Sequence, residues 1–260
     1  DGHGPGIQPQ IKTLLVEEYR FLTFRPVSSA IETHWKAFLV FGLVFTWLAG
    51  VGRYWDNPKA HLWQYLGLGS VAYVFVLAAM VFVLVLPLGP RNWSYRNVLL
   101  FITLTAPPAV LYAIPVELFM TPSAARTTNA WFLAMVAIWR VGLYSAFLRH
   151  VAKLSPGAAI IATLLPLTII VVTLSFLNLE HVVFDLMSGT KPGDRSPNDS
   201  AYGVVVTLSM LSFLAAPVLA IGYFTLIFRA VARQDTTADI GWQQGHIELQ
   251  IPGTDSKGRD

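Results

Sequence analysis

The sequence predicts an all-α membrane protein, a six-transmembrane-helix bundle, and three observations lead to that fold class. Of the 260 residues, 54% are hydrophobic and only 13% are charged, whereas a soluble domain carries about 25% charged residues. Four stretches contain no Asp, Glu, Lys or Arg, namely 60–90, 97–116, 154–179 and 200–228. Each stretch has at least 20 residues, and about 20 apolar residues in a helix cross the hydrocarbon core of a bilayer. We therefore expect a chain that crosses a membrane several times.

Two further spans are indicated by their flanks. Residues 37–52 form a short apolar run between Trp35 and Arg53, and aromatic and basic residues of this kind anchor short spans at the membrane surface. Residues 127–148 are long enough to span, although they contain Arg140. The predicted spans are approximately 36–53, 64–88, 97–119, 128–149, 156–179 and 202–229.

The spans divide the chain into three parts. We expect a cytoplasmic N-terminal arm at 1–35, a transmembrane domain at 36–231 and a polar cytoplasmic C-terminal tail at 232–260. Within the tail, residues 246–251 (HIELQI) alternate between polar and apolar as in a short strand. The rest of the tail is expected to be loose.

The arm is expected to form an amphipathic helix. Its apolar residues recur at helical spacing, and its charged residues fall mostly off that stripe. Two interpretations are open: the helix packs on the cytoplasmic ends of the spans, or it lies along the membrane surface. The apolar residues are Ile11, Leu14, Leu15 and Leu22, and the charged residues are Lys12, Glu17 and Arg20.

Basic residues indicate which side of the membrane each loop faces. With six spans and a cytoplasmic N-terminus, ten of the Lys and Arg residues between Lys12 and Arg233 fall on the inner side and five on the outer side. Because loops rich in Lys and Arg stay in the cytoplasm, both termini are expected there. The predicted location is the bacterial inner (plasma) membrane.

Several function classes are disfavoured by what the sequence lacks. With no cysteine, the chain has no disulfide framework, thiolate metal site or cysteine nucleophile. It carries none of the motifs of zinc proteases, nucleotide-binding loops, dinucleotide-binding domains or serine hydrolases. We therefore predict no catalytic residues and no cofactor, and an enzyme without these motifs is the alternative. Nucleic acid is not an expected partner, because the net charge of +3 is spread beside the spans.

Prolines fall inside three of the predicted spans. Pro107 and Pro108 lie in the middle of the third span, with Pro115 further along, Pro166 lies in the fifth and Pro217 in the sixth. Proline has no N–H to donate, and carbonyls freed within a membrane need a partner in protein or water. The third span is therefore expected to be kinked or broken. Broken helices line the sites of some transporters, but kinks also occur in inert bundles.

The third span and its flanks resemble a known family. The stretch Ser94-Tyr95-Arg96-Asn97-Val98-Leu99-Leu100-Phe101, followed by Thr105-Ala106-Pro107-Pro108 and Leu111, is similar to the third span of bacterial Yip1-like membrane proteins. Phe24-Arg25-Pro26 before the first span is similar too, and the resemblance extends over about Phe21 to Thr173. The chain departs from the family in having six predicted spans where the family usually has five. The signature Asp-Leu-x-Gly-Pro of eukaryotic members is reduced here to Pro87-Leu88-Gly89-Pro90. The resemblance implies a small integral membrane protein, and the role of eukaryotic relatives in vesicle trafficking with small GTPases is not carried over.

Four ionisable residues are predicted at the outer side of the membrane. Glu117 lies near the outer end of the third span, and Glu180, His181 and Asp185 follow the fifth. If these helices are neighbours, the four side chains share one pocket, and such a group suits a divalent cation or a proton relay. The alternative is four ordinary hydrated residues at the interface.

Arg140 is a separate candidate, because it is nine residues before Arg149 and therefore about 13 Å deeper along the helix. Its expected partners are Glu117, carbonyls freed in the third span, or a lipid phosphate. A structural role and a place in a transport path are both open.

The segment 89–96 is the candidate for contact with lipid headgroups. It offers two basic residues for phosphate and two aromatic residues for the interface. These residues are Arg91, Trp93, Tyr95 and Arg96.

The function predicted from these features is that of a noncatalytic, Yip1-like scaffold or partner subunit of a membrane complex. Its expected partners are the lipid bilayer and other membrane subunits or further copies of the chain. The alternative is a small transporter or channel component for an ion, a proton or a small solute, using the broken third span, Glu117 and Arg140. Transport needs water-accessible polar faces, whereas a scaffold needs only packed ones.

Overall fold

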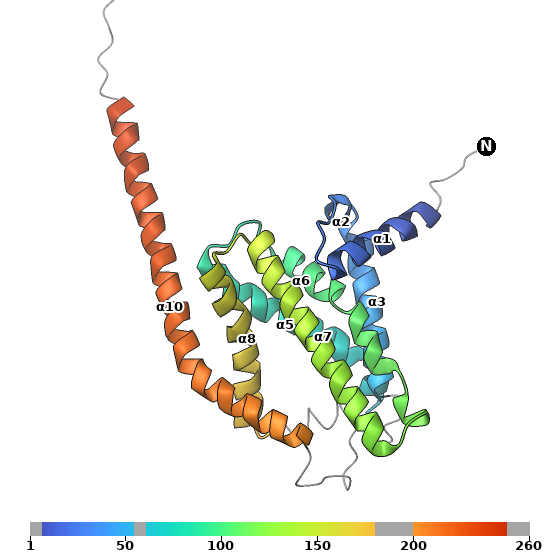
Figure 1. Ribbon diagram of the computed structural model, residues 1–260. Coiled ribbons are helices and arrows are strands. Elements are labelled where there is room, and N and C mark those ends of the chain that lie inside the picture. Colours follow the sequence, from blue (N-terminus) through green and yellow to red (C-terminus); the bar gives the residue numbers. More distant parts are fainter. Residues whose placement is uncertain (1–6, 55–60, 180–199, 249–260) are drawn as a thin grey trace, which may run out of the picture.

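The computed structural model describes residues 7–54, 61–179 and 200–248, and every regular element in these ranges is a helix. Figure 1 shows the long helices packed as a bundle, with α1 and α2 at one end. The α-helices are α1 (Ile7–Leu22), α2 (Ala30–Thr33), α3 (Trp35–Tyr54), α4 (Leu62–Tyr65), α5 (Leu68–Val85), α6 (Tyr95–Leu104), α7 (Pro122–His150), α8 (Pro156–Phe176) and α10 (Ser200–Glu248). The 3-10 helices are η1 (Leu86–Leu88), η2 (Pro107–Ala113) and η3 (Val116–Leu118).

In the described part of the chain, five helices are long and apolar enough to cross a membrane. They belong to α3, α5 with η1, α7, α8 and α10. Their apolar stretches are Trp35–Gly52, Leu68–Leu88, Thr127–His150, Pro156–Phe176 and Gly203–Ala232. The prediction of an all-helical fold of the membrane type is thus confirmed, since the long apolar stretches of the sequence form these helices.

The predicted third span at 97–119 is not one continuous helix. α6 ends at Leu104, and the chain goes on as η2 and η3. The reason lies at Pro107 and Pro108, which cannot donate the next two hydrogen bonds of an α-helix. The predicted break is therefore confirmed, whereas a sixth membrane-length helix is not found among the described residues.

The broken segment follows α3 closely, because glycine on α3 lets two backbones approach. A Cβ on Gly42 would lie 2.7 Å from the backbone carbon of Thr103, and one on Gly52 would lie 2.7 Å from the Cα of Ala113. The residue numbers rise together from Gly42 to Gly52 on α3 and from Thr103 to Ala113 on the broken segment, so the segment runs parallel to α3 for about ten residues. Small residues at a helix contact commonly serve this purpose in membranes.

The core lies where α5, α6, α7 and α8 meet. Phe101 of α6 stacks on Phe147 of α7 with ring centroids 4.3 Å apart, and Val98 and Leu148 beside them are fully buried. A hydrogen bond of 3.1 Å between the hydroxyls of Ser145 and Thr163 joins α7 to α8.

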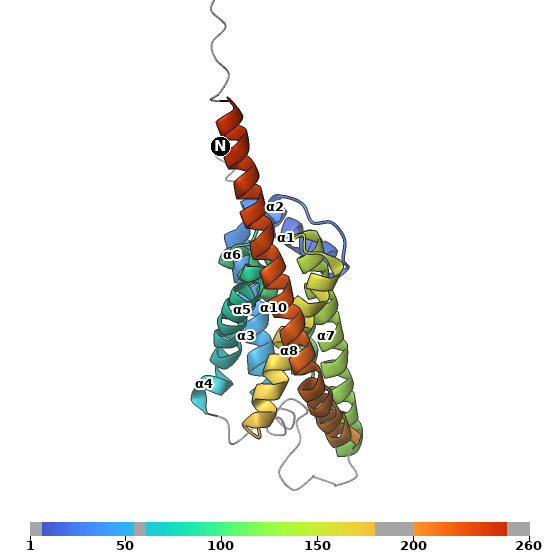
Figure 2. The same ribbon diagram turned by 90° about the vertical axis from the view of Figure 1, so that its left-hand side faces the viewer.

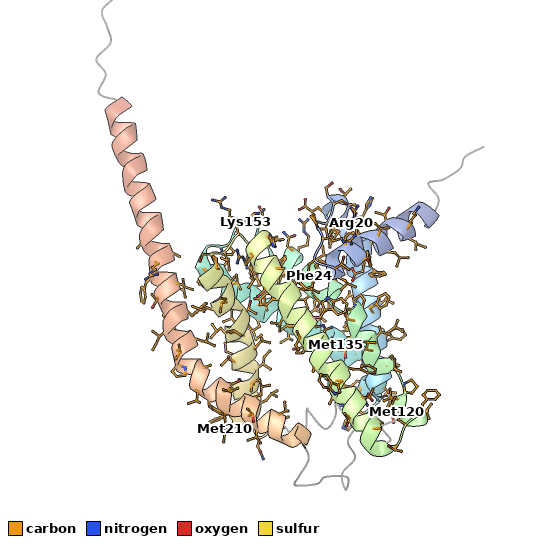
Figure 3. All side chains as sticks on the ribbon, viewed as in Figure 1. Arg20, Phe24, Met120, Met135, Lys153 and Met210 are labelled. Carbon is orange, nitrogen blue, oxygen red and sulfur yellow. The ribbon has the colours of Figure 1, made fainter. Side chains whose placement is uncertain are left out.

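The two ends of the described chain lie at the same end of the bundle. Figures 1 and 2 show α1 and the last turns of α10 on this side. Arg20 and Lys153 lie there too, whereas Met120 and Met210 lie at the opposite end (Figure 3).

α10 is longer than the sequence analysis predicts. Residues after 232 are expected as a loose tail, yet the helix continues through Glu248 and extends far beyond the other helices (Figure 1). The physical reason is that no proline interrupts the chain between Pro217 and Pro252, so nothing prevents a helix that has already formed from continuing. The strand-like interpretation is therefore wrong for residues 246–248, and residues 249–251 lie outside the described residues.

Candidate functional site

The break after α6 brings Arg140 and a backbone carbonyl together. The Nε of Arg140 on α7 donates a hydrogen bond of 2.9 Å to the carbonyl oxygen of Thr105. Thr105 is the residue that ends α6, and it is only 5% exposed. The carbonyl partner expected for Arg140 in the third span is therefore confirmed, and the guanidinium connects α7 to the break.

The Thr105 carbonyl is available because the chain changes its hydrogen-bond pattern at this point. In an α-helix the N–H of Ala109 would donate to Thr105, four residues earlier. Here it donates instead to the carbonyl of Ala106 at 2.8 Å, three residues earlier, as in a 3-10 helix. Arg140 takes the place of the lost N–H. A buried carbonyl without a donor would be costly.

Threonine hydroxyls make further bonds within the same break. Thr103 Oγ1 donates to the carbonyl of Leu100 at 2.9 Å, and Thr105 Oγ1 donates to the carbonyl of Ile102 at 2.7 Å. Thr103 is fully buried. Because these hydroxyls bond to their own turn of helix, the break is packed with its polar groups turned inward. These bonds stabilise the end of α6 from within the segment itself.

The predicted outer cluster lies largely outside the described residues. Glu180, His181 and Asp185 are in the undescribed range 180–199. Glu117 lies in η3, and only its backbone is described. Convergence of these four residues therefore stays a prediction. Over the residues that are described, no group of three His, Asp or Glu side chains is placed to hold a metal ion.

The predicted headgroup segment packs its two aromatic side chains on α5. Trp93 Nε1 donates to the carbonyl of Phe82 at 3.1 Å, and the two rings are stacked. The hydroxyl of Tyr95 donates to the carbonyl of Phe75 at 3.3 Å. The segment is thus held firmly at the surface of the bundle.

The two arginines of that segment remain at the surface. Arg91 and Arg96 are both exposed, and the Arg96 guanidinium lies over the Trp35 ring at 5.7 Å from its centroid. A role in headgroup contact stays a prediction for this segment.

Sequence reasoning missed two buried carboxylates on α1. Glu17 and Glu18 are each only 4% exposed. Glu17 accepts hydrogen bonds from the Ser28 backbone N–H at 2.7 Å and from Arg20 Nη1 at 3.0 Å. The backbone bond from Ser28 is the main reason why the pKa of Glu17 is lowered, and Arg20 adds to it. Glu17 therefore fastens the turn after α1 to the helix.

Glu18 is buried without a partner. Over the described residues, neither of its carboxylate oxygens has a hydrogen-bond partner. Burial alone therefore raises its pKa from 4.5 to about 8, since an unpaired charge is poorly solvated there. The available signal was spacing: Glu18 is four residues from Leu14 and four from Leu22, so all three lie on one helix face.

No family model matches the chain, and neither a curated protein nor a solved structure does. The resemblance to Yip1-like proteins is therefore untested by these comparisons. The function is therefore inferred from the geometry of the described residues.

The first prediction concerns the bond between Arg140 and Thr105. Arg140→Leu leaves the buried Thr105 carbonyl without its donor, and we expect the free energy of unfolding to fall by about 1–3 kcal/mol. The measurement is the thermal unfolding midpoint of the purified protein in mild detergent. Arg149→Leu, at the exposed end of the same helix, is the matched control and should stay near wild type. Equal midpoints for the two variants would mean that the bond contributes no stability.

The second prediction concerns Glu18 and pH. A carboxyl whose pKa is raised in the folded state favours folding at low pH, and that contribution is lost as the pH rises from its ordinary pKa of 4.5 to about 8. Amide hydrogen exchange in α1, corrected for the intrinsic rate, should therefore show less protection at about pH 9 than at about pH 5. Glu18→Gln should remove this dependence on pH.

Glu32→Gln, a substitution of the same kind on exposed α2, serves as the control and should keep the wild-type dependence. Protection of α1 that is independent of pH in the wild-type protein would contradict the assignment to Glu18.

Proposed function

We propose that the protein is a noncatalytic integral membrane protein that acts as a scaffold or partner subunit of a membrane complex. The observation that carries this proposal is the open lateral face of α10. Only 11% of the apolar stretch Gly203–Ala232 is buried by the described part of the chain. A long helix that leaves most of its apolar surface free is available for another membrane protein.

One face of α10 is used within the chain. The hydroxyl of Ser175 on α8 donates to that of Ser209 at 2.9 Å, and the hydroxyl of Tyr223 donates to the carbonyl of Leu84 at 2.8 Å. Gly222 lies against Ile161 so closely that an added Cβ would come within 2.8 Å of the Ile161 side chain. These contacts fix which face of α10 points outward.

The outward face carries a regular row of large apolar side chains, which we call the α10 seam. Its members recur with gaps of three, four and seven residues, the spacing with which helices pair in coiled coils. They are between 58% and 73% exposed. The α10 seam consists of Val204, Leu211, Leu214, Val218, Ile221 and Phe228.

The polar positions in the row do not interrupt its apolar surface. Thr207 and Thr225 lie where the same spacing continues, and their hydroxyls donate to the carbonyls of Gly203 and Ile221 on α10 itself. A hydroxyl bonded to its own helix in this way needs no hydrogen bond from a partner helix. The row therefore suits packing against a second helix.

The polar groups within the spans support a scaffold more than a transporter. Several of those described bond to one another or to nearby carbonyls, which is what a packed interior needs, whereas the buried hydroxyl of Tyr144 on α7 has no hydrogen-bond partner among the described residues. The apolar hollow that the structure shows is formed by side chains of α1. The interior bonds are Thr46 to Gly42, Ser145 to Thr163, Ser175 to Ser209, and Arg140 to Thr105.

One observation favours the second candidate, a small transporter or channel component. Arg140 is a half-buried charge next to a broken helix, and transporters place such breaks at their binding sites. On this alternative, Glu117 would lie on the same path, as the sequence analysis predicts.

We further infer a bacterial plasma membrane location with both ends of the chain in the cytoplasm. The uneven count of basic residues supports this orientation. The position of α1 and the end of α10 on one side of the bundle supports it too. As part of this proposal, we also infer that the chain is related to Yip1-like membrane proteins.

The third prediction tests the α10 seam. A photo-crosslinking amino acid at Leu214, which is 73% exposed, should capture a protein in native membranes, either a second copy of the chain or another subunit. Val76 on α5 is the matched control, because it is 66% exposed on a different helix. We expect a protein adduct from Leu214 and only lipid adducts from Val76. Lipid adducts alone from both positions would contradict the scaffold role assigned to α10.

A further inference from the structure

α1 lies across the end of the bundle, at a large angle to α3 and α7 (Figure 1). Its C-terminal half is fastened there. Trp139 Nε1 donates to the carbonyl of Leu22 at 2.9 Å, and the Phe21 ring meets the edge of Phe101 at 5.7 Å between centroids. In a membrane, a helix placed crosswise at the ends of the spans lies at the level of the lipid headgroups.

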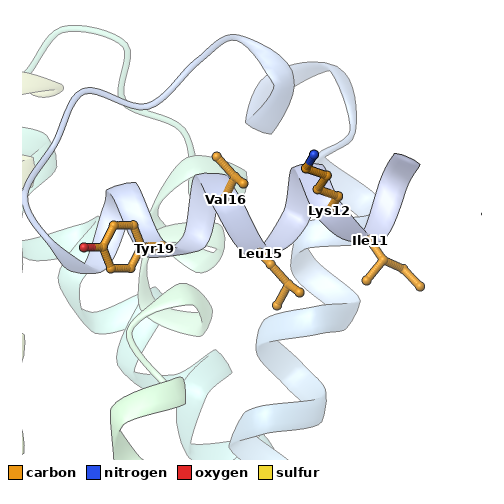
Figure 4. A pocket seen from close by; sticks show the side chains of 5 residues that line it. All are labelled: Ile11, Lys12, Leu15, Val16 and Tyr19. Atoms are coloured by element: carbon orange, nitrogen blue, oxygen red, sulfur yellow. The ribbon is translucent and has the colours of Figure 1, made fainter. Parts of the chain in front are cut away.

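Between Ile11 and Tyr19, α1 has a second apolar face that nothing in the described chain covers. Ile11 and Leu15 are 50% and 54% exposed, and Val16 and Tyr19 are exposed as well. Together with the stem of Lys12 they line an open apolar hollow. Figure 4 shows Ile11 and Leu15 pointing to the side along which α3 descends, with Lys12 and Val16 on the opposite side of the helix. Ile11 and Leu15 thus point toward the membrane, whereas Val16 and the ammonium group of Lys12 point away from it.

The exposed charges on this part of the chain are basic. Both acidic residues of α1, Glu17 and Glu18, are buried, and Glu17 pairs with Arg20. Lys12 is exposed, and the exposed Arg25 places its guanidinium 5.7 Å from the centroid of the Tyr19 ring. Burial of the carboxylates therefore leaves a surface that is apolar below and cationic at its edge.

We propose that this face of α1, formed by Ile11, Leu15 and Tyr19 with Lys12 and Arg25, inserts into the headgroup layer of an anionic phospholipid leaflet. The apolar side chains enter the boundary between headgroups and acyl chains, about 5–10 Å below the surface. Lys12 and Arg25 stay at the level of the phosphates, where each basic residue favours an anionic membrane. This surface is separate from the α10 seam, so the proposal does not depend on the scaffold function.

The test uses the absence of cysteine from the chain, which makes single-cysteine variants simple to label. Leu15→Cys and Thr33→Cys each receive a nitroxide label in the full-length protein. Thr33 is exposed on α2 at the same end of the bundle and serves as the matched control. The variants are reconstituted into vesicles of phosphatidylcholine alone, or of phosphatidylcholine with phosphatidylglycerol. Collision of the nitroxide with oxygen and with a water-soluble nickel chelate gives its depth by electron paramagnetic resonance.

The expected result is a label at Leu15 that lies about 5–10 Å below the phosphates in vesicles with phosphatidylglycerol and nearer to water without it. The label at Thr33 should stay in water in both. Lys12→Glu in the Leu15→Cys background should move the label outward in the anionic vesicles.

Three results would overturn the proposal. A Leu15 label as accessible to the nickel chelate as the Thr33 label would show a face open to water. A label shielded from both oxygen and the chelate would show a face covered by protein. Equal depth in the two kinds of vesicle would remove the preference for anionic lipid.

Discussion

The rest of the structure depends on one constraint, which is that a backbone carbonyl at membrane depth needs a donor. Pro107 and Pro108 break the helix that would supply it, and η2 replaces the α-helical pattern after Ala106. The Arg140 side chain then donates to the carbonyl of Thr105. One guanidinium thereby stabilises the break and fixes α7 against it. The placement of α6 and η2 beside α3 follows, because Gly42 leaves room for the backbone of Thr103.

Several polar groups in the interior of the bundle are hydrogen-bonded within the chain, and the free surfaces lie on the outside. Two of them differ in chemistry. The α10 seam is apolar along the length of a span and suits another transmembrane helix, whereas the outer face of α1 combines apolar side chains with Lys12 and Arg25 and suits a membrane surface. The stability of α1 on the bundle is expected to depend on pH, because ionisation of the buried Glu18 carboxylate opposes the packing of α1. The proposed functions thus lie at two outer surfaces, the α10 seam and the outer face of α1, and the hydrogen-bonded interior holds the helices that carry them in place.

Features that depend on composition, such as the long apolar helices, could be predicted from the sequence. The length of α10 and the contacts between helices could not. Runs without charges predicted α5, α8 and α10, flanking residues predicted α3 and α7, and the proline pair predicted the break. The carbonyl partner of Arg140 was one of three expected alternatives, since sequence spacing gives depth but not which neighbouring helix is nearest. The extension of α10 was missed because alternation at 246–251 looks like a strand, whereas a helix already formed continues at little cost. Glu18 was missed because its helical spacing from Leu14 and Leu22, which places it on their face, was not considered. The predicted cluster around Glu180 lies outside the described residues.

The central observation is that Arg140 supports a broken segment that runs beside α3 in the same direction, and we propose that this segment crosses the membrane. The most direct measurement is labelling of single cysteines with a membrane-impermeant maleimide in sealed vesicles, at Arg91→Cys before α6 and at Thr121→Cys after η3, both exposed positions. The account predicts that only one of the two is labelled until the vesicles are opened, because the positions lie on opposite sides. Labelling of both from the same side would contradict it, since the segment would then enter the membrane and return without crossing.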